Sequence, residues 1–314
     1  MSFSTDVKSE LLNVKATECC QLAELAALLR INGEININSS GVRIEFHTTN
    51  IGVARHVISL VKRHYKTDVE LLSKKQMKLK KNDIFIIRIT NQANKIVHEC
   101  GLIDSHQDIE SDILLVKECC KKAYLRGAFL CAGSINSPRS SSYHMEIHTN
   151  SEGHAEGLSK LLNHFYLNAK YIPKKNGYIA YVKESERISD FLRLTEATNA
   201  LFTFEDERIK RDFVNSITRV MNMDIANQNK TFEAADRQLK SISILENTLD
   251  VSTLTRSMQE AIKLRKTYPE SSLKELAQES IDLIGKSISK SALNHRFRSI
   301  NELADDILKE MEYE

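Results

Sequence analysis

Side chains able to hydrogen-bond to nucleic acid are concentrated between positions 286 and 298 of this 314-residue sequence. The polar and basic residues of this segment are Lys286, Ser287, Lys290, Ser291, Asn294, His295, Arg296 and Arg298. Asparagine and arginine read adenine and guanine edges in the major groove, and lysine neutralises backbone phosphates. No aspartate or glutamate lies between Leu283 and Ile300. The segment is therefore expected to contact DNA.

A helix is expected to present these side chains on one face. Leu293, Phe297 and Ile300 recur at i, i+4 and i+7, which predicts a buried stripe. At about 100° per residue, the opposite face carries Ser291, Asn294, His295 and Arg298, with Lys290 and Arg296 on its flanks. A capping box at 272–275 opens the preceding helix, and Gly285 falls near the bend. The pattern indicates a helix-turn-helix, whose second helix enters the major groove. An ordinary three-helix bundle with a solvated last helix is the alternative, and the acidic helix from Asn301 is expected to give support.

A second polar group lies further upstream, and its basic members Arg219 and Lys230 are candidate phosphate contacts. Its alternative role is helix capping and linker solvation. Before and within it, Ile209, Phe213, Ile217 and Val220 predict an amphipathic helix. The polar stretch at 227–243 is expected to be a connector that becomes helical again from Phe232.

Cysteines are the other residues with possible chemistry: Cys19, Cys20, Cys100, Cys119, Cys120 and Cys131. Two adjacent pairs recur at one motif position, which is open to a metal or redox interpretation. No Cys-x-x-Cys pair is present, and cysteine also behaves as a small buried hydrophobe, so helix packing is the favoured interpretation. His47 and His148 occupy equivalent strand positions without a zinc signature. No metal site and no cofactor are predicted.

Two copies of one unit make up roughly the first 205 residues. Glu18–Asn36 (ECCQLAELAALLRINGEIN) is answered one hundred positions later by Glu118–Asn136 (ECCKKAYLRGAFLCAGSIN). A long repeat that occurs only twice indicates a duplicated domain rather than a solenoid. Each motif begins as a helix whose small residues, among them Ala27 and Gly127, predict a tight helix–helix contact.

Each copy is expected to have the order αββαββα. Strands are predicted at 43–47, 68–74 and 83–90 in the first copy and at 144–148, 169–173 and 177–183 in the second, with helices at about 51–65 and 152–166. Gly33 and Gly133 are expected to end the motif helices in a left-handed conformation. A short first helix, capped by Ser4 or Thr5, should run to about residue 15.

Two basic runs, at 74–82 and 174–177, are expected to be hairpin tips. They would contact phosphates or simply face solvent. The acidic stretch at 104–112 fits a linker between the copies.

The motif helices resemble the LAGLIDADG motif of homing endonucleases, in the stretches LAALLRING (25–33) and LRGAFLCAG (125–133). In that family the two helices pack at a pseudo-twofold axis, and the penultimate motif residue is an acid that binds a divalent metal. Asn32 and Ala132 occupy this position here. Because metal-assisted cleavage needs carboxylates to hold Mg²⁺, the resemblance implies the fold without the nuclease chemistry. A residual or active endonuclease is the alternative.

The chain is also similar to the WhiA family of bacterial proteins, which joins such a degenerate pair to a helix-turn-helix. The similarity includes SFSTDVKSEL (2–11), both motif helices, 219–231 and the tail from Ser272. It implies an α+β fold with a duplicated LAGLIDADG-like domain over 1–205 (repeats about 1–100 and 115–205), a helical linker over 206–245 and an all-α helix-turn-helix domain over 246–314. It further implies a non-enzymatic DNA-binding role in cell division, chromosome segregation and sporulation, as a transcription factor or a chromosome-associated protein.

Composition limits the remaining classes. The 41% hydrophobic and 27% charged residues are typical of a globular protein, and the net charge of +2 means that a DNA surface must concentrate its cations locally. No apolar run reaches the length of a membrane span, so a cytoplasmic, nucleoid-associated protein is expected. Aromatic residues are 6% and show no ribonucleoprotein signature, which disfavours an RNA-binding module. The expected partner is double-stranded DNA, with the duplicated domain serving as a scaffold, a second weak DNA surface or a dock for a protein.

Overall fold

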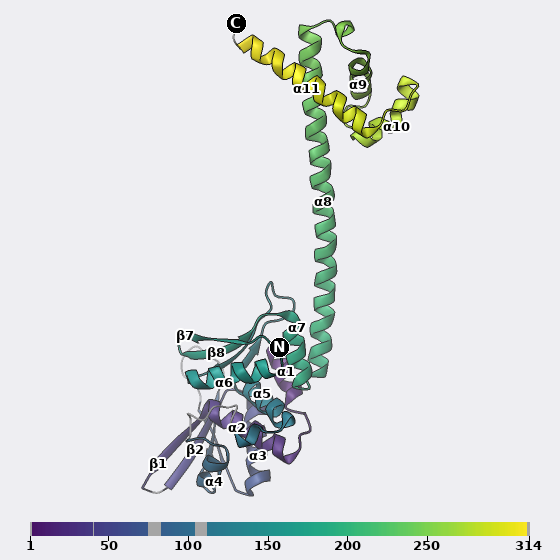
Figure 1. The fold of residues 1–314 in the computed structure, drawn as a ribbon. Coiled ribbons are helices and arrows are strands. Elements are labelled where there is room, and N and C mark those ends of the chain that lie inside the picture. The colour runs from purple at the N-terminus through teal and green to yellow at the C-terminus, as the bar shows by residue number, and fades with distance from the viewer. Residues whose placement is uncertain (1, 40, 75–82, 104–111, 313–314) are drawn as a thin grey trace. The chain divides into compact units, whose positions relative to one another are not determined.

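The computed structural model describes residues 2–39, 41–74, 83–103 and 112–312. They form two compact units, Met1–Arg211 and Asp212–Glu314, and helix α8 (Thr198–Thr248) begins in the first and ends in the second (Figure 1). Most of the predicted basic tip at 74–82 and of the predicted linker at 104–112 lies outside the described residues. None of the described helices is both long and apolar enough to cross a membrane.

Each half of the first unit has the predicted order αββαββα. After α1 (Phe3–Leu11), the first half contains α2 (Glu18–Asn32), β1 (Gly33–Asn38), β2 (Gly41–Thr48), α3 (Ile51–Tyr65), β3 (Glu70–Lys74), β4 (Ile84–Ile89) and α4 (Ala93–Glu99). The second half follows the short 3₁₀ helix η2 (Ile113–Leu115) with α5 (Glu118–Ala132), β5 (Gly133–Ile135), β6 (Met145–Thr149), α6 (Glu152–His164), β7 (Lys170–Lys174), β8 (Gly177–Val182) and α7 (Ser185–Leu194). The described strands form two antiparallel sheets, ordered β1-β2-β4-β3 and β5-β6-β8-β7. The predicted α+β fold is confirmed.

Helices cover one face of each sheet because the strand residues alternate. In β2, Ile44 and Phe46 are fully buried, while the intervening Glu45 is not. In β6, Met145 and Ile147 are buried in the same way. Helix α3 contacts β2 and β4, and α6 contacts β6, β7 and β8. The buried faces and their helices form one continuous hydrophobic core in this unit.

The two motif helices, α2 and α5, lie side by side in this core (Figure 1). They run parallel, because Gly127 lies next to Glu24 and, four residues later in each helix, Cys131 lies next to Leu28. A methyl group built on Gly127 would lie 2.5 Å from the backbone oxygen of Glu24 and 3.1 Å from the Cβ of Ala27. One turn further along, the thiol of Cys131 approaches the carbonyl of Leu28 at 3.7 Å. The predicted tight contact of Ala27 and Gly127 is therefore confirmed, and it depends on a glycine in α5.

The ends of the motif helices differ from the prediction. Gly33 (φ −90°, ψ 134°) and Gly133 (φ −79°, ψ 149°) are extended rather than left-handed, so each helix continues at once into a strand, β1 or β5. No position was predicted for these two strands. Glycine is needed there because a Cβ would collide with the preceding turn, at Leu29 and Phe129.

The first helix also differs in its cap and its length. Ser2, not Ser4 or Thr5, is the N-cap of α1, and the helix ends at Leu11. Ser4 Oγ instead accepts a hydrogen bond from the Ile135 N–H and donates one to the Ile135 carbonyl. This pair of bonds fixes α1 to β5 of the second half.

The second unit is helical, with a core contributed by the end of α8 and by α9 (Arg256–Thr267), α10 (Leu273–Ile284) and α11 (Lys290–Glu312). The short helix η3 (Val251–Thr253) connects α8 to α9. Arg265 is 2% exposed and lies at the centre of this core. Its guanidinium donates to Gln238 Oε1 at 2.9 Å and to the carbonyl of Ser271 at 2.5 Å, and it lies 5.4 Å from the centroid of the Phe297 ring. One side chain thus joins α8, the α9–α10 loop and α11.

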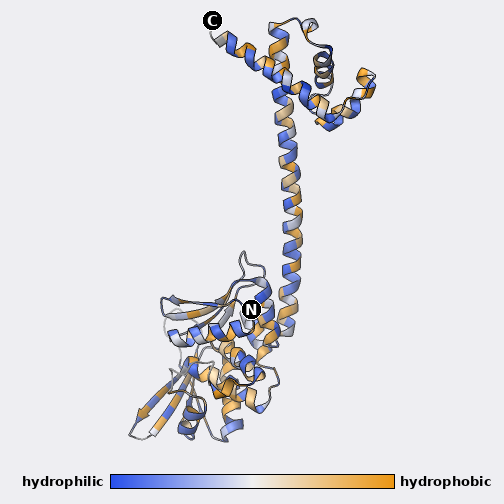
Figure 2. Cartoon of the chain, viewed as in Figure 1, coloured by the Kyte–Doolittle hydropathy of each residue, from blue (hydrophilic) through white to orange (hydrophobic). Residues whose placement is uncertain are grey.

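Two expectations about the helices of this part were wrong. Residues 227–231 are helical, because the stretch 227–243 contains no proline or glycine to interrupt α8. The acidic segment from Asn301 is a continuation of α11 rather than a separate helix, and its Ala304 is fully buried. The apolar stripe on α8 is present but exposed, at 62% for Ile209 and 66% for Phe213, and Figure 2 shows its apolar positions interspersed with hydrophilic ones.

We expect Gly127→Ala to destabilise the first unit by about 1–3 kcal/mol, because the added methyl group must push the α2 backbone away. Helix propensity alone predicts the opposite sign, since alanine is favoured over glycine by about 1 kcal/mol. Gly153→Ala is the matched control, because Gly153 lies in a helix with nothing within 4 Å of its Cβ position. Denaturant unfolding should show a lower midpoint only for Gly127→Ala. Equal midpoints would mean that the helix pair accommodates the methyl group.

A second prediction concerns His154, whose ring nitrogens are 2.8 Å from Tyr124 Oη and 3.1 Å from Thr149 Oγ1. Burial, assisted by the charge of Arg30, lowers the pKa of His154 to about 4. Because the unfolded state takes up a proton at higher pH, this residue should cost stability as pH falls from about 6.5 towards 4, with a slope of at most about 1.4 kcal/mol per pH unit. Above this range its contribution is constant.

Thermal unfolding of the wild type and of His154→Gln between pH 7.5 and 4.5 tests this pH dependence. The variant should lose stability less steeply as the solution is acidified, because glutamine has no proton to gain. Parallel curves would show that His154 does not titrate between the folded and unfolded states.

Candidate nucleic-acid interface

The second unit contains a helix-turn-helix formed by α10, residues 285–289 and α11. The capping box at Ser272 and Glu275 is present, and Gly285 ends α10 with a left-handed φ of 76°. Ser280 Oγ then accepts the N–H of Ile288 at 2.9 Å, and Ser289 Oγ accepts the N–H of Ala292 at 3.2 Å. The turn is therefore anchored at both ends, which fixes the start of α11.

The face of α11 that lies against the core is the predicted one. Leu293 and Ile300 are fully buried and Phe297 is 1% exposed, which confirms the stripe. The described residues of the opposite face are exposed, namely Lys290, Ser291, Asn294, His295 and Arg298. Lys286 and Ser287 are exposed in the turn. The first turns of α11 thus present amide, hydroxyl, imidazole and cationic groups to solvent.

Arg296 is placed differently from its neighbours. Its side chain is 18% exposed, and its guanidinium lies 3.1 Å from Glu260 Oε2 and donates to the carbonyl of Ser257 at 3.3 Å. Lys286 Nζ lies 2.8 Å from the same Glu260 oxygen. The hydrogen bond from Lys286 lowers the pKa of Glu260, Arg296 adds to this, and partial burial opposes it. This ion-pair group attaches both the turn and α11 to α9.

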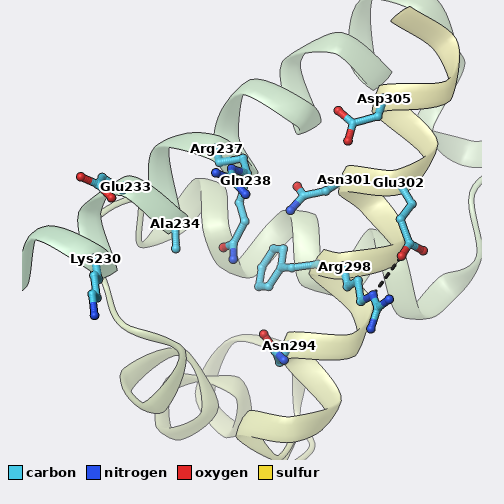
Figure 3. Close-up of a pocket in the computed structure, with 11 residues that line it drawn as sticks. Lys230, Glu233, Ala234, Arg237, Gln238, Asn294, Arg298, Asn301, Glu302 and Asp305 are labelled. Carbon is cyan, nitrogen blue, oxygen red and sulfur yellow. Dashed lines mark hydrogen bonds and ion pairs between the residues drawn. The ribbon is translucent and has the colours of Figure 1, made fainter. Parts of the chain in front are cut away.

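Lys230 of α8 lies on the same surface as two of the candidate base-reading residues. It lines a cavity of about 490 Å³ together with Arg237, Asn294 and Arg298, and Figure 3 shows these side chains around the opening. Acidic residues line the same cavity, and one of them, Glu302, lies 2.9 Å from Arg298. The cavity therefore mixes both charge signs. Arg219 is exposed on α8 about 16 Å before Lys230 at 1.5 Å per residue, and it does not line this cavity.

The degenerate motif positions lie at the C-terminal ends of α2 and α5. Asn32 Nδ2 donates a hydrogen bond of 3.2 Å to the carbonyl of His47, and Ala132 offers only a methyl group. Neither side chain can provide an anionic oxygen to a metal ion. These two positions therefore carry no carboxylate.

A cluster of thiols was not anticipated. Cys19 and Cys20 of α2 and Cys119 and Cys120 of α5 have sulfur atoms that all lie within 4.8 Å of one another. The equal offset of the two Cys-Cys pairs in the repeat was the available signal, because parallel motif helices bring equivalent positions together. His47 and His148 do not join them. They lie near Glu34, at 3.7 Å, and the carbonyl of Asn176, at 2.9 Å, respectively.

The position of Arg296 leads to a prediction about stability. Arg296→Ala should destabilise the second unit by about 1–3 kcal/mol, because a hydrogen bond to the charged, mostly buried Glu260 is lost. Arg298→Ala is the control: its partner Glu302 is exposed, and such a pair is worth about 0–1 kcal/mol. Urea unfolding followed by circular dichroism should separate the two variants. A similar loss of stability for both would show that the Glu260 group does not hold α11.

Family models match most of the chain. The WhiA N-terminal LAGLIDADG-like domain matches residues 18–103, and the WhiA LAGLIDADG-like domain matches residues 121–214. The WhiA C-terminal HTH domain matches residues 217–304.

Whole-chain comparisons agree with these matches. The chain is 46% identical to the "Probable cell division protein WhiA" of Oceanobacillus iheyensis and 42% identical to that of Brevibacillus brevis, each over 310 residues and 98% of both chains. Its fold is similar to a crystal structure of full-length DUF199/WhiA from Thermatoga maritima, with 23% identity, a TM-score of 0.60 and coverage of 98% of this chain and 99% of that one. The chain therefore belongs to the WhiA family.

Proposed function

We propose that this chain is a non-enzymatic protein that binds double-stranded DNA through the exposed face of α11 and acts in cell division. The relatives named above as probable cell division proteins support the cellular role. Chromosome segregation and, in bacteria that sporulate, septation during sporulation are the finer roles that we propose with it. Because we propose that it binds DNA, we expect the protein to lie in the cytoplasm, at the nucleoid.

The observation that carries the DNA proposal is the exposed start of α11. Asn294 and Arg298 are spaced i, i+4 on an exposed face, a spacing that allows two base-reading side chains to reach one groove. Lys290 and Lys286 lie at the entry to the helix, where phosphates flank the groove. The anchored turn and the buried Arg265 hold this face rigidly, so that little order has to be gained on binding.

Cations elsewhere are a weaker basis for DNA binding. On the uncovered faces of the sheets, Arg88 lies 2.9 Å from Glu45, and Lys174 lies 2.9 Å from Glu146. Arg298 and Lys286 of the second unit are paired in the same way, with Glu302 and Glu260, but only the α11 face adds an exposed lysine, Lys290, that forms no ion pair with a described residue, next to the base-reading Asn294. We therefore assign the duplicated domain a scaffolding role or the docking of a partner protein, rather than the main DNA contact. Arg219 and Lys230 remain candidate phosphate contacts on α8.

The absence of carboxylates at Asn32 and Ala132 is the reason for proposing that the protein is not a nuclease. In metal-assisted phosphodiester cleavage, anionic ligands hold the cation against the scissile phosphate. The Asn32 amide, which is hydrogen-bonded to the His47 carbonyl, cannot hold a cation in this way, and neither can the Ala132 methyl group. The motif helices would then contribute only packing.

The test separates base reading from phosphate binding. Asn294→Ala and Arg298→Ala should each weaken binding to the preferred duplex by about 1–3 kcal/mol and binding to random duplex much less. Lys290→Ala should weaken both equally and reduce the salt dependence by about one released counterion. Affinities for both duplexes, measured at several salt concentrations, give these differences.

Glu310→Ala is a suitable control, because it changes an exposed charge near the far end of the same helix. Binding by all α11 variants that equals the wild type would exclude this helix as the reader. The same proteins, incubated with plasmid DNA and Mg²⁺ or Mn²⁺, should produce no nicks. Cleavage that disappears in Asn32→Ala would overturn the non-enzymatic assignment.

A further inference from the structure

The four thiols at the start of the motif helices belong to the first unit, whereas the proposed DNA surface belongs to the second. Cys19 and Cys20 occupy the first turn of α2, and Cys119 and Cys120 occupy the first turn of α5. Residues from two halves of the chain, one hundred positions apart, thus meet at the N-terminal end of the helix pair. The opposite end of the same pair carries the degenerate motif positions.

The spacing of the sulfur atoms suits a single tetrahedral metal ion. All four Sγ atoms lie within 4.8 Å of one another. A zinc ion with four Zn–S bonds of about 2.3 Å requires sulfur atoms about 3.8 Å apart. Small side-chain rotations therefore suffice to bring the sulfur atoms to bonding distance. Four thiolates without other ligands form a closed, structural type of zinc site, and soft sulfur ligands favour zinc over magnesium or calcium.

The surroundings of the cluster act in both directions: burial raises the pKa values of Cys20 and Cys120, whereas the helix N-termini and Thr17 favour anionic sulfur. Both helices have 15 residues, and the thiols lie in their first turns, where the positive end of the helix dipole is located. Thr17, the N-cap of α2, has its hydroxyl 3.4 Å from Cys19 Sγ and supplies an outer-shell hydrogen bond. Cys20 and Cys120 are buried, whereas Cys119 is exposed. The site is thus packed on one side and open to an entering ion on the other.

We propose that Cys19, Cys20, Cys119 and Cys120 bind one zinc ion as a tetrathiolate. Binding converts four thiols and Zn²⁺ into one Zn(S-Cys)₄ centre with a net charge of −2, and it releases four protons to solvent. No electron is transferred. The centre joins the two halves of the duplicated domain at the start of the motif helices, as a crosslink between segments far apart in the sequence.

The mutual approach of all four sulfur atoms distinguishes this site from two alternatives. A pair of disulfides would bring the sulfur atoms together two by two, and needs an oxidant. A two-iron cluster would hold two thiolate pairs on separate metal atoms and so further apart. A mononuclear tetrahedral site uses the arrangement that is present.

The full chain, purified under reducing conditions from cells given zinc, should contain about one zinc ion per molecule by elemental analysis. After removal of zinc, titration with cobalt(II) alone should produce the visible absorption of a tetrahedral tetrathiolate, and zinc should abolish it. A strong chelator should lower the Tm of the first unit. Cys120→Ser and Cys119→Ser should each reduce zinc affinity at least ten-fold.

Cys131→Ser is the matched control, because it lies in the same helix as Cys119 and Cys120 but near Leu28, outside the cluster. It should keep the wild-type zinc content. Substitution of the buried Cys120 can unfold the helix pair. The Cys119→Ser variant, at an exposed position, and the cobalt spectrum of the wild-type protein therefore test the proposal without the Cys120 variant. Wild-type protein that is folded, free of zinc and without cobalt absorption would overturn the proposal. So would a mass showing disulfides in the freshly isolated chain, or the visible absorption of an iron–sulfur cluster.

Discussion

The close, parallel contact of α2 and α5 is the constraint on which the first unit depends. Gly127 permits the backbones to approach, and the space leaves no room for a side chain between it and Glu24. A buried ion pair lies at the same level: Arg126 donates to Glu24 Oε2 at 2.8 Å, and His56 lies 2.8 Å from Glu24 Oε1. Because both carboxylate oxygens are satisfied, the cost of burying the charge is offset by hydrogen bonds. The ion pair also fixes the register of one helix against the other.

In the second unit, the buried Arg265 holds the helices in place. Helix α11 must be held in one orientation if its outer face is to match a groove. Arg265 provides this by donating to carbonyls of the α9–α10 loop while its planar group lies over Phe297. Lysine could not replace it, because a single ammonium group cannot reach several fixed acceptors and stack on a ring at once. The Glu260 ion pairs then attach the turn from the other side.

Much of this fold could be predicted because its signals are local. The alternation of apolar and polar residues predicted β2 and β6, and small residues predicted the contact between α2 and α5. The capping box at Ser272 predicted the start of α10. The strands β1 and β5 could not be located, because Gly33 and Gly133 are typical of helix ends and their real role depends on a collision within the preceding turn. The continuity of α8 and α11 could not be predicted either, because a polar composition is typical both of a connector and of an exposed helix.

The candidate site residues likewise divide into those whose placement local sequence patterns predicted and those whose placement they did not. Exposure of Asn294, His295 and Arg298 followed from helical periodicity, which places them opposite Leu293 and Phe297. The capture of Arg296 by Glu260 did not, because Glu260 lies 36 positions earlier and periodicity carries no information about partners on another helix. The thiol cluster falls between these cases. Its residues were visible as a repeat, but their convergence required knowing that the helices run parallel.

The parallel arrangement of α2 and α5 explains why equivalent side chains of the two copies meet in this domain. Because the two helices are equivalent and lie side by side, each residue near their common axis lies next to its counterpart from the other copy. A residue type that occupies one motif position in both copies is therefore present twice at the same place. At the C-terminal ends, Asn32 and Ala132 leave the pair without carboxylates for a cation. At the N-terminal ends, the Cys-Cys pairs bring together four sulfur atoms from only two short sequences. Neither feature disturbs the contact around Gly127, which lies between them. The helix pair can therefore carry different side chains at its two ends while the contact around Gly127 is unchanged.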